Sequence, residues 1–116
     1  MLSFGPQTEI FLVAGATDMR KSYDTLAALV RQALQQDPLS GRVFVFCNHQ
    51  KNRLKILFWE RGGFWLVSRR LEQGTFAWPA DGSRPLPAEE LLLIASGIDL
   101  KDTRRRRWYE RPSLSK

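Results

Sequence analysis

The 116-residue sequence contains one cysteine and one histidine. Cys47 therefore cannot form an internal disulfide, and with only His49 close to it in the sequence it lacks the partners of a zinc site. We expect a buried or half-buried thiol that packs as a small hydrophobe. His49 falls in a predicted turn, where a solvated side chain is the ordinary case and a catalytic role the exception.

The motifs of common catalytic sites are also missing. The sequence has no GxSxG, no HExxH, no P-loop and no CxxC pair. Asp18 and Asp24 would need a further carboxylate to bind Mg²⁺, and bases or turn residues flank each acid, so Asp18 is better interpreted as capping or bracing a helix start. These absences predict a protein that is not an enzyme and has no cofactor. A small metal-dependent nuclease is the weakest of the functions considered.

Long hydrophobic runs are absent as well. No apolar stretch approaches the roughly 20 residues needed to cross a bilayer. The N-terminal MLSFGPQTEI lacks a basic region followed by an apolar one. These absences predict a cytoplasmic protein without a membrane partner. Hydrophobic residues make up 43% of the chain and charged residues 26%, a composition typical of one folded domain.

Positive charge is concentrated at the C-terminus. The formal net charge is +6, and residues 101–116 hold seven bases and two acids, a balance of +5. We predict a single compact domain over residues 1–100 and a basic, flexible tail over residues 101–116. A polyanionic partner should depend heavily on this tail.

The hydrophobic pattern predicts the order of the elements. EIFLVAG is typical of a short strand, and apolar residues at helical spacing from Ser22 predict an amphipathic helix that ends at QQDPLSG. RVFVFCN, RLKILFWE and FWLVSRR predict three antiparallel strands, and GTFAWP a fourth that ends at Pro79. ADGSRP predicts a loop, and LPAEELLLIASG a second helix with Gly97 as its C-cap. The predicted fold class is α+β, an antiparallel β-meander of four to five strands packed with one or two helices, with a basic C-terminal tail.

Turn lengths predict the strand register. A two-residue turn at Gly62-Gly63 would place Phe58 opposite Val67, and a five-residue loop NHQKN would place Phe46 opposite Leu54. One core face follows, made of Phe44, Phe46, Leu54, Ile56, Phe58 and Val67. The other face is mixed, with Arg53, Lys55, Trp59 and Arg70 among Val45, Leu57 and Leu66.

Arg20 and Lys21 suit phosphate binding, because they lie beside the first turn of the predicted helix, where free backbone N–H groups also attract anions. A local ion pair of Arg20 with Asp18 or Asp24 is an equally good interpretation. The position of these residues therefore leaves both roles open.

Bases of the predicted hairpin lie close in sequence to Trp59 and Trp65. Nucleic-acid-binding proteins use such mixtures of cations and stacking surfaces, although a solvated sheet face is the more ordinary interpretation. The hairpin bases expected to bind nucleic acid are Lys51, Arg53, Lys55, Arg69 and Arg70.

The tail TRRRRWYERPSLSK is the clearest electrostatic feature. Its four adjacent arginines would neutralise several phosphates and give salt-dependent, sequence-tolerant affinity. Trp108 or Tyr109 could stack on a base or dock on a partner. A tail that only improves solubility is the alternative. The four arginines are Arg104, Arg105, Arg106 and Arg107.

Four segments, spread in order over roughly residues 9 to 100, carry a resemblance to a known family. They are ATDMRKSYDTLAALV, DPLSGRVFVFCN, RLKILFWERGGFWLVSRRLEQGTFAWP and LLLIASGID. The sequence resembles TnpB, the small accessory protein of bacterial transposable elements of the insertion-sequence-sixty-six type, and not the longer RNA-guided nuclease of the same name. The resemblance implies a non-catalytic partner of a separate, larger transposase that performs the DNA strand chemistry. It implies no active site and no ligand.

Two functions are therefore expected from different classes. The favoured one is an accessory factor in transposition that binds DNA through its basic residues. The alternative is a protein-interaction module that docks on the element-encoded transposase or a second accessory protein without contacting DNA. Aromatic residues are usual anchors of such surfaces. The expected anchors are Trp59, Trp65 and Leu66.

Overall fold

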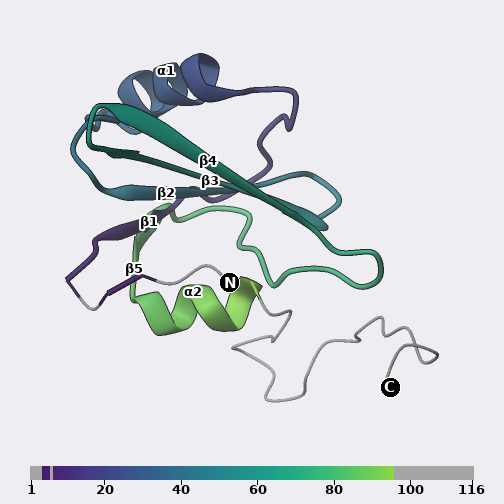
Figure 1. Ribbon diagram of the computed structural model, residues 1–116. Helices are drawn as coiled ribbons and strands as arrows, with labels where there is room; N and C mark the ends of the chain where they lie inside the picture. The colour runs from purple at the N-terminus through teal and green to yellow at the C-terminus, as the bar shows by residue number, and fades with distance from the viewer. Residues whose placement is uncertain (1–3, 6, 96–116) are drawn as a thin grey trace, which may run out of the picture.

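The computed structural model describes residues 4–5 and 7–95. Its elements are β1 (Ile10–Leu12), α1 (Tyr23–Ala33), β2 (Val43–Cys47), β3 (Arg53–Glu60), β4 (Gly63–Arg70), β5 (Arg84–Leu86) and α2 (Ala88–Ala95). The strands form one sheet in the order β4-β3-β2-β1-β5, with α1 on one face and α2 on the other (Figure 1). The predicted α+β class is confirmed. Gly97 and the predicted tail lie outside the described residues.

The sheet is mostly antiparallel, with one parallel pair that the sequence prediction lacked. β2, β3 and β4 form the predicted meander, and β5 pairs antiparallel with β1. β1 and β2 run parallel. A parallel pair needs a long crossover, and α1 supplies it by carrying the chain across one face of the sheet.

The helix α1 forms where its periodicity predicted. Ser22 is the N-cap residue, and its backbone N–H donates to Oγ1 of Thr25 at 2.9 Å. Leu26, Ala27 and Val30 are buried. The helix therefore covers the sheet with the apolar stripe that the sequence showed. Over the described part of the chain, no helix is long and apolar enough to span a membrane.

The hydrophobic core has two layers because both faces of the sheet are covered. All five residues of β2 are buried. Phe44 and Phe46 pack on the side of α1 together with Leu57, whereas Val45 and Leu54 pack on the side of α2. Full burial of each large side chain contributes about 1.5–3 kcal/mol to folding. The central strand is thus fixed from both sides.

The loop between β2 and β3 shows why the predicted core face was wrong. Oδ1 of Asn48 accepts hydrogen bonds from the backbone N–H groups of Asn52 and Arg53, each at 3.0 Å. This side chain stabilises a loop one residue longer than predicted, so Phe46 pairs with Lys55. A shift of one residue exchanges the two faces. Phe44 and Phe46 therefore lie on the α1 face, opposite to the face that carries Leu54, Ile56, Phe58 and Val67.

The turn between β3 and β4 lies one residue earlier than predicted. Arg61 and Gly62 have φ angles of 50° and 83°, as a type I′ turn requires. Gly63 is thereby released into β4, and Phe58 lies opposite Trp65 instead of Val67. The register differs from the prediction by two residues, which leaves every side chain of the hairpin on its predicted face.

The predicted strand GTFAWP was wrong. Residues 74–79 form no strand, and their apolar side chains Phe76 and Trp78 are instead buried against the sheet on the side of α2. Nε1 of Trp78 donates a hydrogen bond to the carbonyl oxygen of Val13 at 3.1 Å. The edge of β1 is occupied by β5, within a segment that the sequence analysis placed partly in a loop.

Candidate nucleic-acid interface

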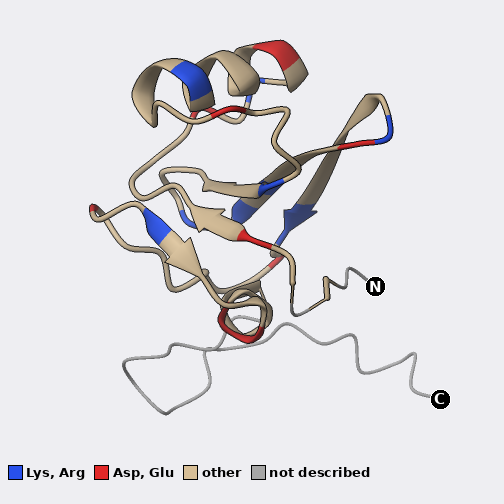
Figure 2. Cartoon of the chain, turned by 90° about the vertical axis from the view of Figure 1, so that its left-hand side faces the viewer, with Lys and Arg blue, Asp and Glu red and all other residues tan. Residues whose placement is uncertain are grey.

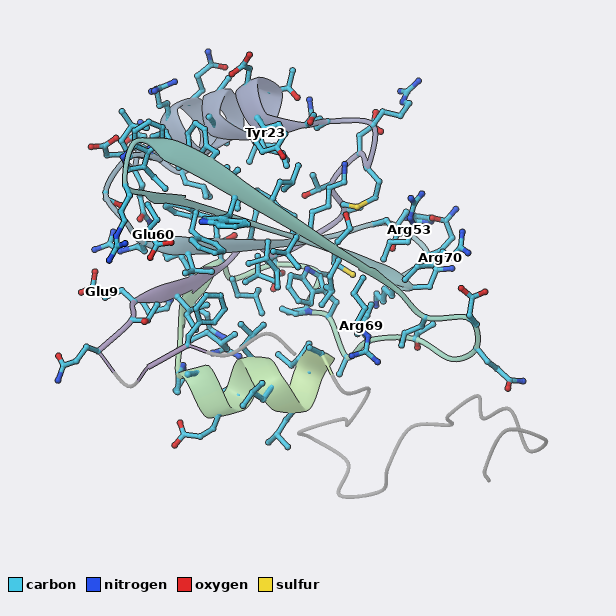
Figure 3. All side chains as sticks on the ribbon, viewed as in Figure 1. Glu9, Tyr23, Arg53, Glu60, Arg69 and Arg70 are labelled. Carbon is cyan, nitrogen blue, oxygen red and sulfur yellow. The ribbon has the colours of Figure 1, made fainter. Side chains whose placement is uncertain are left out.

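Basic side chains gather at the end of the β3–β4 hairpin that lies opposite its turn. Arg53 begins β3, Arg69 and Arg70 end β4, and Lys51 lies in the preceding loop. Figure 3 shows the three arginines together, at the other end of the sheet from Glu60. In Figure 2 the same grouping is visible as basic segments at neighbouring strand ends. We call these four residues the basic end.

The register brings two arginines of the basic end face to face. Arg53 lies directly opposite Arg70, whereas Arg69 lies opposite Leu54 and so belongs to the other face of the sheet. Like charges in opposite positions destabilise a sheet. A hollow of about 320 Å³ joins the three arginines and is also lined by Met19, Leu54, Lys55, Ser68 and Glu72. An anion in this hollow would relieve the repulsion.

Acidic side chains neutralise the basic end only in part. Nη2 of Arg70 lies 3.0 Å from Oε2 of Glu72, and both side chains are exposed, so the pair contributes at most about 1 kcal/mol. Neither Arg53 nor Arg69 forms an ion pair with an acidic residue in the described ranges. At least two guanidinium groups are therefore available to a ligand.

Lys55 has a different position from the other hairpin bases. Its ammonium group donates hydrogen bonds to the backbone carbonyl oxygens of Met19, at 2.8 Å, and Lys21, at 2.7 Å. Two of the three ammonium hydrogens are thus used inside the protein. The structure gives Lys55 the role of fastening the loop before α1 to the sheet.

The loop itself is closed by its own hydrogen bonds. The carboxylate of Asp18 accepts from the backbone N–H of Arg20 at 2.9 Å and from its guanidinium at 2.7 Å. These hydrogen bonds, first of all that of the Arg20 side chain, lower the pKa of Asp18 to about 2. The N–H of Lys21 donates to the carbonyl oxygen of Asp18, and that of Thr17 to the carbonyl oxygen of Cys47.

Of the two roles left open for Arg20, the structure contains the local ion pair. Its guanidinium pairs with Asp18 while the side chain remains 91% exposed. The backbone N–H groups of Arg20 and Lys21 donate to Asp18, and that of Ser22 donates to Thr25 in the first turn of α1. These three N–H groups are therefore used inside the protein, and phosphate binding by Arg20 and Lys21 stays a prediction.

The tryptophans do not lie among the hairpin arginines. Trp59 contacts Phe64 edge to face, with ring centroids 5.0 Å apart, near the turn. Trp59 lies six positions after Arg53 in β3, a distance of about 20 Å along an extended strand. The predicted mixture of cations and stacking rings is therefore divided between the two ends of the hairpin.

The three expected docking residues do not share a face. Leu66 packs in the cluster on the α1 side, and Trp59 lies on that same face of the sheet. Trp65 lies on the other face, where it stacks on Phe58 and is 55% exposed. A single partner surface built from all three residues is not present.

Cys47 and His49 have the ordinary environments expected of them. Cys47 is fully buried, and this burial raises the pKa of its thiol to about 12. His49 is exposed in the loop after β2. Among residues 4–5 and 7–95, no group of three or more His, Cys, Asp or Glu side chains could hold a metal ion. Arg104, Arg105, Arg106 and Arg107 lie beyond the described ranges.

Sequence reasoning did not identify three residues that line the hollow: Met19, Ser68 and Glu72. Glu72 follows Arg70 by two positions, which is a weak signal of a local ion pair. Lys55 holds the loop of Met19 against the sheet beside the hollow, and no sequence spacing between residues 19 and 55 indicates that contact.

Comparison with known proteins identifies the family. The family model described as IS66 Orf2 like protein matches residues 8–105. The uncharacterized protein y4hO of Sinorhizobium fredii is 34% identical over 101 residues, which cover 85% of this chain and 88% of y4hO. The uncharacterized protein y4jC of the same organism is 33% identical over 99 residues, 84% of this chain and 85% of y4jC. No solved structure matches. The resemblance noted in the sequence is confirmed, and the chain belongs to the IS66 Orf2-like family of transposition-associated accessory proteins.

Proposed function

We propose that this accessory protein binds the DNA backbone through its basic end and thereby assists the separate transposase of the element. One observation carries the proposal: Arg53 lies directly opposite Arg70, with Arg69 beside them on one hollow. Placing like charges opposite each other costs stability in the free protein. A bound phosphate would offset that cost, because its negative charge attracts both guanidinium groups.

Arginine suits this role because its planar guanidinium can donate two parallel hydrogen bonds to one phosphate. Arg53 and Arg70 lie on one face of the sheet and Arg69 on the other. The basic end therefore presents guanidinium groups on both sides of the strand ends and can follow successive phosphates along one DNA strand. Contacts of this kind position a protein on DNA without reading its sequence.

The arginine tail adds to the same activity in this proposal. In addition to the basic end, the tail would contribute further phosphate contacts through Arg104, Arg105, Arg106 and Arg107. Replacement of all four by alanine should lower both the affinity for DNA and its salt dependence. Unchanged affinity in that variant would remove the tail from the interface and leave the basic end as the proposed site.

The test is fluorescence-anisotropy titration of the full chain with a labelled element-end duplex and a scrambled duplex, over about 50 to 300 mM salt, where phosphate contacts change affinity strongly. The variant Arg53→Ala/Arg69→Ala removes the two guanidinium groups of the basic end that have no acidic partner among the described residues. We expect the slope of log affinity against log salt to fall by roughly two, because each phosphate contact contributes about 0.9.

A second double variant controls for net charge. Arg31 lies in α1 and Arg61 at the hairpin turn, and neither forms an ion pair with another of the residues that the structure describes. Arg31→Ala/Arg61→Asn removes the same two charges from other parts of the surface, and asparagine tolerates the positive φ at position 61. The proposal fails if both double variants lose the same slope, or if the unmodified chain binds neither duplex at the lowest salt.

A further inference from the structure

The two edges of the sheet are built differently. The edge strand β5 has three residues and contains Pro85, and short strands and prolines are usual protections against pairing with another chain. The edge strand β4 has eight residues and no proline. Within residues 4–5 and 7–95, no strand pairs with the outer side of β4. One edge is protected, and the other is left long and regular.

The hairpin geometry determines which groups β4 presents outward. In a two-residue type I′ hairpin the residues that flank the turn, here Glu60 and Gly63, exchange both backbone hydrogen bonds. The same alternation reaches the far end of the hairpin, where the N–H of Leu71 donates to the carbonyl oxygen of Asn52 at 2.8 Å. The alternate residues therefore direct their N–H and C=O groups outward: Phe64, Leu66, Ser68 and Arg70.

The order of side chains along β4 is complementary to itself when reversed. Phe64 and Trp65 stand at its start, and Arg69 and Arg70 at its end. Trp65 is 55% exposed, and its Nε1 donates to Oε1 of Glu60 at 3.1 Å. The start of the strand is thus aromatic and acidic, whereas its end is basic.

We propose that β4 pairs antiparallel with β4 of a second copy of this chain, around a two-fold axis at Val67. Trp65 then lies opposite Arg69 of the second copy on one face, and Phe64 lies opposite Arg70 of the second copy on the other. Both are cation–aromatic pairs. The carboxylate of Glu60 lies beside Trp65 and adds an opposite charge for the same arginine.

Other arrangements of two copies fit the strand less well. Parallel pairing would place the arginines of the two copies side by side, and like charges in neighbouring positions repel. An antiparallel pair centred on Leu66 would place Arg69 opposite Gly63, which has no side chain. The arrangement centred on Val67 pairs residues 64–70 of the two copies, and it is the one that places each arginine of β4 opposite an aromatic ring. A two-fold pair is also closed, because each copy contributes its one unprotected edge.

The first test is sedimentation equilibrium of the full chain over about 1 to 100 µM, a range that covers homodimers of moderate affinity. Ser68 is exposed and directs its N–H outward, so Ser68→Pro removes an outward donor without removing a hydrogen bond to β3. We expect a dimer for the unmodified chain and at least about tenfold weaker association for Ser68→Pro, which loses a ladder hydrogen bond and gains a ring at the interface. Ser68→Ala keeps the N–H and should associate like the unmodified chain.

Circular dichroism shows whether Ser68→Pro is still folded, and the crosslinking variant provides an independent test if it is not. Val67 faces its own copy across the proposed axis, at the Cα separation of about 4.5 Å that a non-hydrogen-bonded antiparallel pair has and that a disulfide can bridge. Val67→Cys should therefore form a disulfide-linked dimer with oxidised glutathione, whereas the unmodified chain, with its buried Cys47, should not.

Crosslinking through Leu66→Cys instead of Val67→Cys would overturn the proposed register. A monomeric unmodified chain, a larger assembly, or an undiminished dimer of folded Ser68→Pro would overturn the proposal. None of these outcomes depends on whether the chain binds DNA.

Discussion

The two ends of the β3–β4 hairpin are made by the same two strands but carry different side chains, basic at one end and mainly aromatic at the other. At the basic end Arg53 faces Arg70, and a hollow with little acidic lining joins them. At the turn end Trp59 faces Phe64, and Trp65 lies beside Glu60. About 20 Å of extended strand separates these ends. The comparison teaches that cations and aromatic rings close in the sequence need not share a surface, and that one hairpin can carry two separate binding features.

The largest predicted effect concerns the residue between the two ends. Leu57 is fully buried and lies opposite Phe44 on one side and Leu66 on the other. Leu57→Ala should lower the free energy of unfolding by about 2–5 kcal/mol, because it leaves a cavity in the core. Urea unfolding followed by circular dichroism measures the change. Leu92→Ala, at a position that is 51% exposed, is the matched control and should stay within about 0.5 kcal/mol. A small loss for Leu57→Ala would contradict the burial of Leu57 in the core between the two ends.

The second prediction separates two lysines near the basic end. Lys55→Met should lower the free energy of unfolding by about 1.5–3 kcal/mol, the usual contribution of hydrogen bonds from a charged group, because two loop carbonyl oxygens lose their donor. Lys51→Met, at an exposed position, should change it by less than about 0.5 kcal/mol. Both values come from the same urea titrations. Equal losses for the two variants would contradict the assignment of Lys55 to the loop.

The third prediction tests the turn end. Trp65→Ala removes the stack on Phe58, whose ring centroid lies 6.3 Å away, and should cost about 0.5–1.5 kcal/mol of stability. Trp65→Phe keeps a ring at the position and should lose less. Thermal unfolding of both variants at one protein concentration measures the two losses. Equal losses for Trp65→Ala and Trp65→Phe would contradict the stack on Phe58 as their source.

The smallest predicted effect concerns the acid that closes the loop beside the basic end. The hydrogen bonds from Arg20, first of all that of its side chain, lower the pKa of Asp18 from the ordinary value of 3.8 to about 2 in the folded chain. A lowered folded-state pKa contributes stability that is complete above pH 3.8 and disappears as the pH falls towards about 2. The stability difference between the unmodified chain and Asp18→Asn should therefore shrink between those values in thermal unfolding experiments. A difference that stays constant with pH would exclude this ion pair as its source.

Sequence patterns predicted the local elements well, because local interactions determine them. The apolar spacing after Ser22 gave the start of α1 and its buried stripe, and the β-branched and aromatic runs gave β2, β3 and β4. The burial of Cys47 followed from its chemistry and its place in an apolar run. The family also followed from the sequence, since its signatures are contiguous segments.

Register and pairing could not be predicted in the same way. The face occupied by Phe44 and Phe46 depends on whether Asn48 holds a loop of one length or the next, and both lengths fit the residues. GTFAWP has the composition of a strand, but pairing also needs a free sheet edge, and β5 takes the edge beside β1. Such choices depend on contacts between segments far apart in the chain.

The candidate site shows the same division. The sequence by itself determined that the protein is basic, has few groups suited to catalysis and carries hairpin arginines that suit phosphate, because residue types and charges are properties of the chain. Only the tertiary structure decided which bases are available: Arg53 and Arg69 remain without an acidic partner in the described part of the chain, while Lys55 is used by the loop before α1. The physical reason is that a charged group's role depends on which hydrogen-bond partners come within about 3 Å of it, and the folded chain alone determines those distances.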